Sequence, residues 1–278
     1  MERRKTPIVV GHRGARGLEP ENTLKAFEEA LELGAKGLEM DLYMTRDGQV
    51  VVTHDATISP ALCLSPDGKP LEEQESERLQ IYQLNYSQIK PFDCGSADNE
   101  DFPAQENTEA HIPLLADVLA TAGRYSSPHT PLTYLMEIKS GPETDGRQHP
   151  APRFFVQQVM EIISGQKAEK EAVMIGFDKR VLREAREQNP GVRTGLSIVE
   201  LSGLERELEE LGFVPDFICP LHTELNQDFL EKAWKRGLQV IAWTVNEVED
   251  QQRMIQLQVD GIITDYPDRA LKLIQEQI

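Results

Sequence analysis

The sequence predicts a (β/α)₈ barrel that carries one small insertion. Short apolar runs of strand length alternate with amphipathic segments of helix length along almost the whole chain, and such repeated units are typical of a parallel sheet. Most of the runs are continuously apolar, as strands covered on both faces are. Eight main units in 278 residues favour a closed barrel over an open, doubly wound sheet. We therefore expect one catalytic domain over residues 1–278.

Strands are expected at nine apolar runs. The third run is short, and we interpret it as an extra piece outside the eight-stranded barrel. In chain order the runs are Pro7–Val10, Gly37–Leu42, Val50–Thr53, Leu132–Ile138, Ala172–Phe177, Arg193–Ser197, Phe217–Cys219, Leu238–Thr244 and Gly261–Thr264.

Capping residues mark several of the expected helices. Asn226 opens one amphipathic segment and Gly237 closes it. Asn246 with Glu249 resembles a capping box ahead of the next segment. Pro267 suits the first turn of a last helix, because the missing N–H of proline costs nothing there.

Residues 56–112 break the alternation and form the expected insertion, between the second strand region and the helix that follows it. Residues 56–110 hold 11 acidic and 3 basic side chains, which is −8 of the total charge of −18. We expect a solvated acidic surface with some helix near Asn85–Ile89. Two interpretations stay open: a wall that narrows a cleft, or a decoration without a role. A second long loop is expected at Ser140–Arg153.

The composition excludes several classes of protein. A net charge of −18 disfavours nucleic acid and anionic membrane surfaces as partners. The longest stretch without Asp, Glu, Lys or Arg is Tyr125–Met136, too short for a membrane-spanning helix.

Cys63, Cys94 and Cys219 match no zinc or disulfide pattern, and we expect free thiols. Without a signal peptide a cytoplasmic location is expected, although a mature periplasmic or secreted form stays open. The oligomeric state is not determined.

A barrel places catalytic groups at the carboxyl ends of its strands. Two carboxylates that stand two residues apart in a strand face the same side. Carboxylates gathered in an interior repel one another, and a hard divalent cation with oxygen ligands is the simplest remedy. The strand-end residues are His12 and Arg13, Glu39 and Asp41, His54 and Asp55, and Glu137 and Lys139.

The remaining strand-end groups suggest the reaction. His12 and His54 suit proton transfer near neutral pH. Arg13 and Lys139 place positive charge in an otherwise acidic protein, which indicates an anionic oxygen ligand such as phosphate. These residues together indicate a metal-assisted phosphoryl or acyl hydrolase.

An ordered set of motifs runs along the chain: Gly11-His-Arg-Gly, Glu19-Pro-Glu-Asn-Thr23, Glu39-Met-Asp41, His54-Asp55, Glu137-Ile-Lys139, Ala242-Trp-Thr-Val-Asn246 and Asp260-Gly-Ile-Ile-Thr-Asp265. This set resembles the glycerophosphodiester phosphodiesterase family over nearly the whole chain, from about Ile8 to Pro267. One departure lies at the end of the fourth expected barrel strand, where this chain has Gly176-Phe177 and that family often has Ser-Phe.

The resemblance implies a TIM barrel that hydrolyses glycerophosphodiesters to sn-glycerol 3-phosphate and an alcohol, with one divalent cation, Mg²⁺ or Ca²⁺. By resemblance, Glu39, Asp41 and Glu137 ligate the metal; His12 and His54 are the general acid and base; Arg13 and Lys139 bind phosphate oxygens; Trp243 lines the glycerol end; and Glu19 and Asn22 support the first loop.

Two alternatives to this function stay open. One is a phosphodiesterase that acts on whole lipids, like a phospholipase D or sphingomyelinase D. The acidic insertion argues against it, since membrane contact favours apolar or basic loops. The other is a binding module of the same fold that has lost catalysis. Water attack and a cyclic phosphate intermediate are equally compatible with the sequence.

Overall fold

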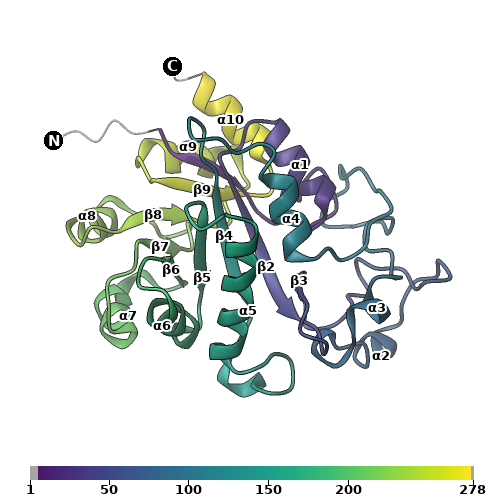
Figure 1. The fold of residues 1–278 in the computed structure, drawn as a ribbon. Coiled ribbons are helices and arrows are strands. Elements are labelled where there is room, and N and C mark those ends of the chain that lie inside the picture. Colours follow the sequence, from purple (N-terminus) through teal and green to yellow (C-terminus); the bar gives the residue numbers. More distant parts are fainter. Residues whose placement is uncertain (1–5, 277–278) are drawn as a thin grey trace.

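The computed structural model describes residues 6–276 as a closed, eight-stranded parallel barrel with helices around it (Figure 1). The strand order is β1-β9-β8-β7-β6-β5-β4-β2, and pairing of β1 with β2 closes the ring. The one remaining strand of the described chain, β3, pairs with β2 in the antiparallel direction and lies outside the ring. The predicted (β/α)₈ barrel and its extra strand are thus confirmed.

All nine predicted strands form, and their ends agree with the prediction to within two residues. Their agreement follows from the continuous apolar runs, which become buried on both faces. The strands are β1 (Ile8–Gly11), β2 (Gly37–Met44), β3 (Val50–Val52), β4 (Thr133–Ile138), β5 (Ala172–Gly176), β6 (Arg193–Ile198), β7 (Phe217–Pro220), β8 (Gln239–Ala242) and β9 (Gly261–Thr264).

Helices return the chain between the parallel strands and pack on the outside of the barrel. The α-helices are α1 (Leu24–Glu32), α2 (Glu73–Ser76), α3 (Tyr86–Ile89), α4 (Leu115–Ala122), α5 (Pro152–Gly165), α6 (Lys179–Gln188), α7 (Leu204–Leu211), α8 (Gln227–Lys235), α9 (Val248–Gln256) and α10 (Pro267–Gln275). Three short 3₁₀ helices are η1 (Ile81–Gln83), η2 (Pro142–Thr144) and η3 (Leu201–Gly203). Within residues 6–276, no helix is both long and apolar enough to cross a membrane.

The predicted helix caps are partly correct. The Asn226 side chain accepts a hydrogen bond from the Phe229 N–H, and Pro267 opens α10. The capping box at Asn246 was wrong, because α9 begins at Val248 and the preceding residue provides no side-chain cap. The Asn246 side chain instead donates a hydrogen bond to Asp265, which follows β9. Asn246 has the residue type of a helix cap but stabilises the end of the neighbouring strand.

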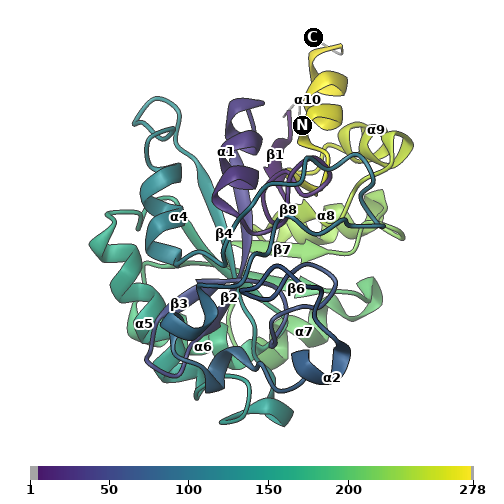
Figure 2. The ribbon, with the colours of Figure 1, turned by 90° about the vertical axis from the view of Figure 1, so that its right-hand side faces the viewer.

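Residues 56–112 contain only α2, η1 and α3 as regular elements, and they pack beside β2 and β3 (Figure 2). The predicted helix near Asn85–Ile89 forms as α3, with a capping box between Asn85 and Gln88. Apolar side chains of this segment make a small core of their own against Tyr43 and Val51. The segment is therefore a folded unit on one side of the barrel.

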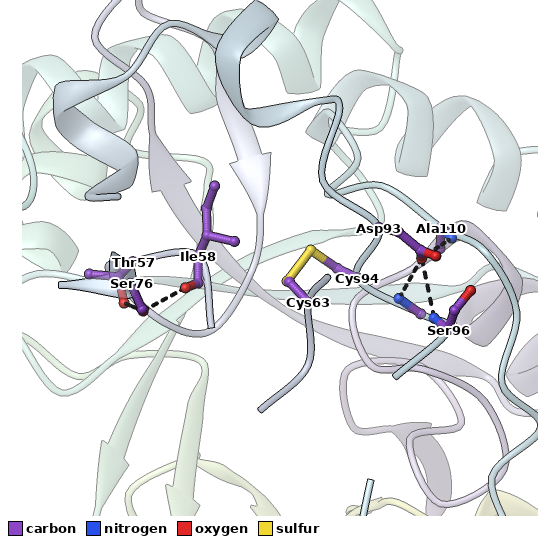
Figure 3. Close-up of a disulfide and its surroundings, with 9 residues drawn as sticks. Thr57, Ile58, Cys63, Ser76, Asp93, Cys94, Ser96 and Ala110 are labelled. Atoms are coloured by element: carbon purple, nitrogen blue, oxygen red, sulfur yellow. Dashed lines mark hydrogen bonds between the residues drawn. A yellow bond between two sulfur atoms is a disulfide. The ribbon is translucent and has the colours of Figure 1, made fainter. Parts of the chain in front are cut away.

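Two cysteines of this segment form a disulfide, which corrects the prediction of free thiols. Cys63 and Cys94 are bonded across 31 residues of sequence (Figure 3), while Cys219 is buried and free. Next to the bond, the Asp93 carboxylate accepts three backbone N–H bonds, one of them from Ala110. Spacing alone could not reveal this pair, because the intervening loop is irregular.

We expect the double substitution Cys63→Ser with Cys94→Ser to lower the free energy of unfolding by about 2–4 kcal/mol, because the bond restricts the unfolded chain. Urea unfolding of oxidised protein measures the change. The reductant dithiothreitol should destabilise the wild type by a similar amount and leave the double variant unchanged. Equal stability of oxidised wild type and variant would contradict this.

Candidate active site

Three carboxylates converge at the carboxyl ends of β2 and β4. The strand register sets Asp41 beside Glu137, and Glu39 points the same way two residues earlier. One oxygen from each of the three lies within 4.8 Å of the others. Glu39 and Asp41 are buried and Glu137 is partly buried. This donor set of buried carboxylate oxygens fits a hard divalent cation.

Two cations neutralise this cluster unevenly. Lys139 Nζ lies 2.9 Å from Asp41 and 2.8 Å from Glu137. The Arg13 guanidinium lies 3.2 Å from Asp41, whereas Glu39 accepts only the backbone N–H of Arg13, at 3.1 Å. Asp41 thus receives two cationic side chains, while Glu39 receives none at hydrogen-bond distance within the described chain.

The pKa directions follow this imbalance. Burial and the neighbouring Asp41 and Glu137 charges raise the pKa of Glu39 well above its usual range. Burial also opposes ionisation of Asp41, but Lys139 and Arg13 outweigh it and lower the pKa of Asp41. Glu39 is therefore an underneutralised carboxylate in a buried cluster, and a bound cation would relieve it.

His12 reaches the cluster from the end of β1. Its Nε2 lies 3.9 Å from Glu39, and its Nδ1 lies 2.7 Å from the buried Asp265 carboxylate beyond β9. Asn246 holds that carboxylate in turn, donating to it at 2.7 Å and accepting the Asp265 N–H at 2.9 Å. A carboxylate on Nδ1 fixes the ring so that Nε2 faces the cluster.

His54 follows β3 and lines the same cavity as the cluster. Its Nδ1 lies 2.9 Å from Asp55, and its side chain is 37% exposed, against 13% for His12. Both imidazoles thus have a carboxylate partner on Nδ1. The carboxylate partner of His12, Asp265, is buried, whereas Asp55 beside His54 is partly exposed. The two rings therefore differ in their access to solvent.

The loop between β1 and α1 shapes the floor of the site. Arg13 and Asn22 adopt positive φ angles of 51° and 55°, joined by a backbone bond from Asn22 N–H to the Arg13 carbonyl. The Asn22 amide donates to Asp41 at 3.0 Å. Glu19 is buried and pairs with Lys25 at 2.8 Å, farther from the carboxylates.

One cavity of about 320 Å³ joins these groups. Eight of the ten predicted site residues line it, and Glu19 and Asn22 lie behind it. Trp243 follows β8 and donates its indole N–H to the Cys219 carbonyl, and its ring meets Phe177 edge-on with centroids 5.6 Å apart. The structure therefore brings the three carboxylates and the two imidazoles together around one cavity, as predicted.

Sequence analysis missed two residues of this site. Asp265 follows β9 and meets the strand-end rule that selected the others, but its motif was used only for the resemblance. Arg16 lines the cavity beneath Phe102, with its guanidinium carbon 4.6 Å from the ring centroid. No local pattern marks Arg16, because Phe102 comes from the distant 56–112 segment.

Comparison with known proteins identifies the family to which this chain belongs. The model of the glycerophosphoryl diester phosphodiesterase family matches residues 12–269. The chain belongs to this family. It is accordingly a phosphodiesterase, with the TIM barrel expected from the motifs.

Relatives and solved structures agree with that assignment. A glycerophosphodiester phosphodiesterase of Caldanaerobacter subterraneus is 28% identical over 97% of this chain and 98% of its own. A candidate glycerophosphoryl diester phosphodiesterase of Silicibacter pomeroyi has a crystal structure that covers 99% of this chain and 95% of its own, at 31% identity and a TM-score of 0.89. A phosphodiesterase of Oleispira antarctica, solved with its product sn-glycerol 3-phosphate, is 20% identical, covers 97% of both chains with a TM-score of 0.77, and shows the shared fold.

Proposed function

We propose that this enzyme hydrolyses glycerophosphodiesters to sn-glycerol 3-phosphate and an alcohol, with one divalent cation and a pair of histidines. The single observation that carries the proposal is the joint cavity, in which three carboxylates, two imidazoles and three cationic side chains surround one space. Hydrolysis of a phosphodiester needs charge neutralisation on its oxygens and proton transfer at the attacking hydroxyl and at the departing alkoxide, and this set of groups provides both.

Glu39, Asp41 and Glu137 would hold the cation, which is Mg²⁺ or Ca²⁺ by the chemistry of the ligands. When bound, such an ion supplies Lewis-acid polarisation of a phosphoryl oxygen. Arg13 and Lys139 line the same cavity and attract the remaining phosphate oxygens. Asn22 keeps Asp41 oriented through its amide.

His12 and His54 carry the proton transfers in this proposal. One ring accepts the proton of the attacking hydroxyl, and the other donates a proton to the departing alkoxide. The attacking hydroxyl is water, or the adjacent glycerol hydroxyl if a cyclic phosphate forms first. Trp243 borders the cavity with an apolar face and would pack on the glycerol carbons.

A coupled assay for sn-glycerol 3-phosphate tests this function directly. Purified protein is incubated with a panel of glycerophosphodiesters in Mg²⁺, in Ca²⁺ and in excess chelator. We expect release with at least one cation and less than about 1% of that rate in chelator. Release that is unaffected by chelation would overturn the metal requirement, and no release from any diester would overturn the function.

We expect Asp265→Asn to lower kcat by about 10- to 100-fold, because an amide no longer fixes the His12 ring in one tautomer. KM should change by less than about threefold, since Asp265 does not line the cavity. Steady-state kinetics measure both constants, and thermal unfolding shows whether the fold is intact. Asp228→Asn, on the exposed first turn of α8, is the control and should behave as wild type.

A second candidate substrate is a lysophospholipid. A rat relative named lysophospholipase D is 25% identical over 95% of this chain and 85% of its own. Of the five exposed large apolar residues in the described chain, four follow barrel strands or begin the next helix at the mouth end: Phe154, Phe177, Val199 and Val248. Turnover of lysophosphatidylcholine at a kcat/KM above that of glycerophosphocholine would establish this candidate over the water-soluble diesters.

A further inference from the structure

A second cavity, of about 240 Å³, opens beside the candidate active site. The two cavities share Glu137, Lys139 and Phe177 in their walls, so they lie side by side. The rest of the second cavity is formed by Tyr43 at the end of β2 and by the loop after β4. A ligand held at the three carboxylates would need to pass only these three shared side chains to reach this space.

The loop that forms the outer wall is fixed by its own contacts. His149 is buried, and its Nδ1 lies 2.8 Å from the Pro150 carbonyl, which only a protonated Nδ1 can satisfy. Its Nε2 is then free to accept the Gly141 N–H at 3.0 Å. Asp145 accepts two hydrogen bonds from Arg180, at 2.7 and 3.0 Å. The wall is thus largely preformed.

Phe177 separates this cavity from Trp243, because its ring meets the indole and also lines the cavity. In the ring of eight strands, β4 is four positions from β8, so their ends face each other across the mouth. The two ester arms of a tetrahedral phosphorus diverge. If the glycerol arm lies against Trp243, as proposed above, the arm of the departing alcohol points toward β4 and the second cavity.

The walls of this cavity favour a neutral, hydroxyl-rich group. Tyr43 and Gln148 make no side-chain hydrogen bond to another residue of the described chain, and Thr144 adds a hydroxyl. Glu137 is the one carboxylate among the lining residues that the structure describes, and it is paired with Lys139 at 2.8 Å. A quaternary ammonium would meet the Lys139 charge here without an unpaired carboxylate to offset it, although Tyr43 and Phe177 are aromatic.

We propose that this cavity binds the departing alcohol and selects neutral polyols, of the glycerol or inositol class, over cationic amino alcohols. The inference rests on the proposed function and names the substrate class for the same site. Tyr43 and Gln148 donate to or accept from the hydroxyl groups of the polyol, and Phe177 covers its carbon skeleton.

The test compares kcat/KM for glycerophosphoinositol and glycerophosphoglycerol with kcat/KM for glycerophosphocholine. We expect the wild type to favour a polyol diester by at least about tenfold. Gln148→Leu and Tyr43→Phe should each lower that ratio by about three- to tenfold, the effect of one lost uncharged hydrogen bond. Gln148→Glu should lower the ratio further, because a carboxylate attracts choline.

Gln157→Leu, on the outer face of α5 where Gln157 bonds Glu161, is the matched control and should leave the ratio unchanged. Tyr43→Phe removes a single oxygen, so it keeps the test valid if a Gln148 variant does not fold. A wild-type preference for glycerophosphocholine, or variants that slow all diesters equally, would overturn the inference while the proposed function stands. Absence of turnover with every diester would instead overturn the function itself.

Discussion

Replacing either histidine of the site with alanine should lower kcat for a glycerophosphodiester by about 10²–10⁴-fold, the usual contribution of a general acid or base. His12 and His54 line the same cavity, and each has its Nδ1 held by a carboxylate. A natural alcohol leaves as a poor, strongly basic alkoxide, so the acid that protonates it is as necessary as the base. Both single variants should therefore be severely impaired, as assayed by sn-glycerol 3-phosphate release.

A 4-nitrophenyl phosphodiester separates the two roles. 4-Nitrophenolate departs without a proton, so the variant that lacks the general acid should recover most of its activity on this substrate. The variant that lacks the base should stay slow. His129→Ala, in an exposed turn before β4, is the control and should behave as wild type. Near-normal turnover of a natural diester by either His12→Ala or His54→Ala would contradict the proposed mechanism.

The barrel could be predicted from the sequence because its signals are local. Each strand is a short, continuous apolar run, and burial on both faces demands that pattern. Polar residues at the strand ends also marked the site, because a charged side chain stands out in a run that is otherwise apolar. Glu39, Asp41 and Glu137 interrupt otherwise apolar strands, and the parallel register sets Asp41 beside Glu137, with Glu39 two residues earlier on the same face.

The features that sequence analysis missed depend on contacts between distant segments. The Cys63–Cys94 bond joins two parts of the irregular 56–112 segment. Phe102, which Arg16 contacts, belongs to the same segment. Asn246 has the residue type of a helix cap, and only the neighbouring position of Asp265 reveals its actual bonds. Spacing along the chain carries no information about such pairs, because the path between the partners has no period.

The site also shows how an acidic protein can bind an anion. The net charge of −18 is spread widely, with −8 of it in residues 56–110. Lys139, Arg13 and Arg16 line the cavity itself. A phosphodiester is thus attracted locally by these cations, while extended polyanions are repelled by the remaining surface.

The three carboxylates should differ when they are substituted. We expect Glu39→Gln to lower kcat/KM by about 10³-fold, since loss of one ligand removes several kcal/mol of charge stabilisation. Without metal, however, Glu39→Gln should be at least as stable as wild type, because the raised pKa of Glu39 shows that its charge is unfavourable in the folded state. Added Mg²⁺ or Ca²⁺ should raise the Tm of the wild type but not of this variant.

Asp41→Asn should give the opposite stability result in the same metal-free experiment. Its carboxylate is the partner of Lys139 and Arg13, which lower its pKa, so its loss leaves two partly buried cations undercompensated. Both variants should lose the metal-induced rise in Tm, yet only Asp41→Asn should have a lower Tm than metal-free wild type. Glu205→Gln, exposed on α7, is the control. If both variants kept the metal-induced rise, these carboxylates would not hold the cation.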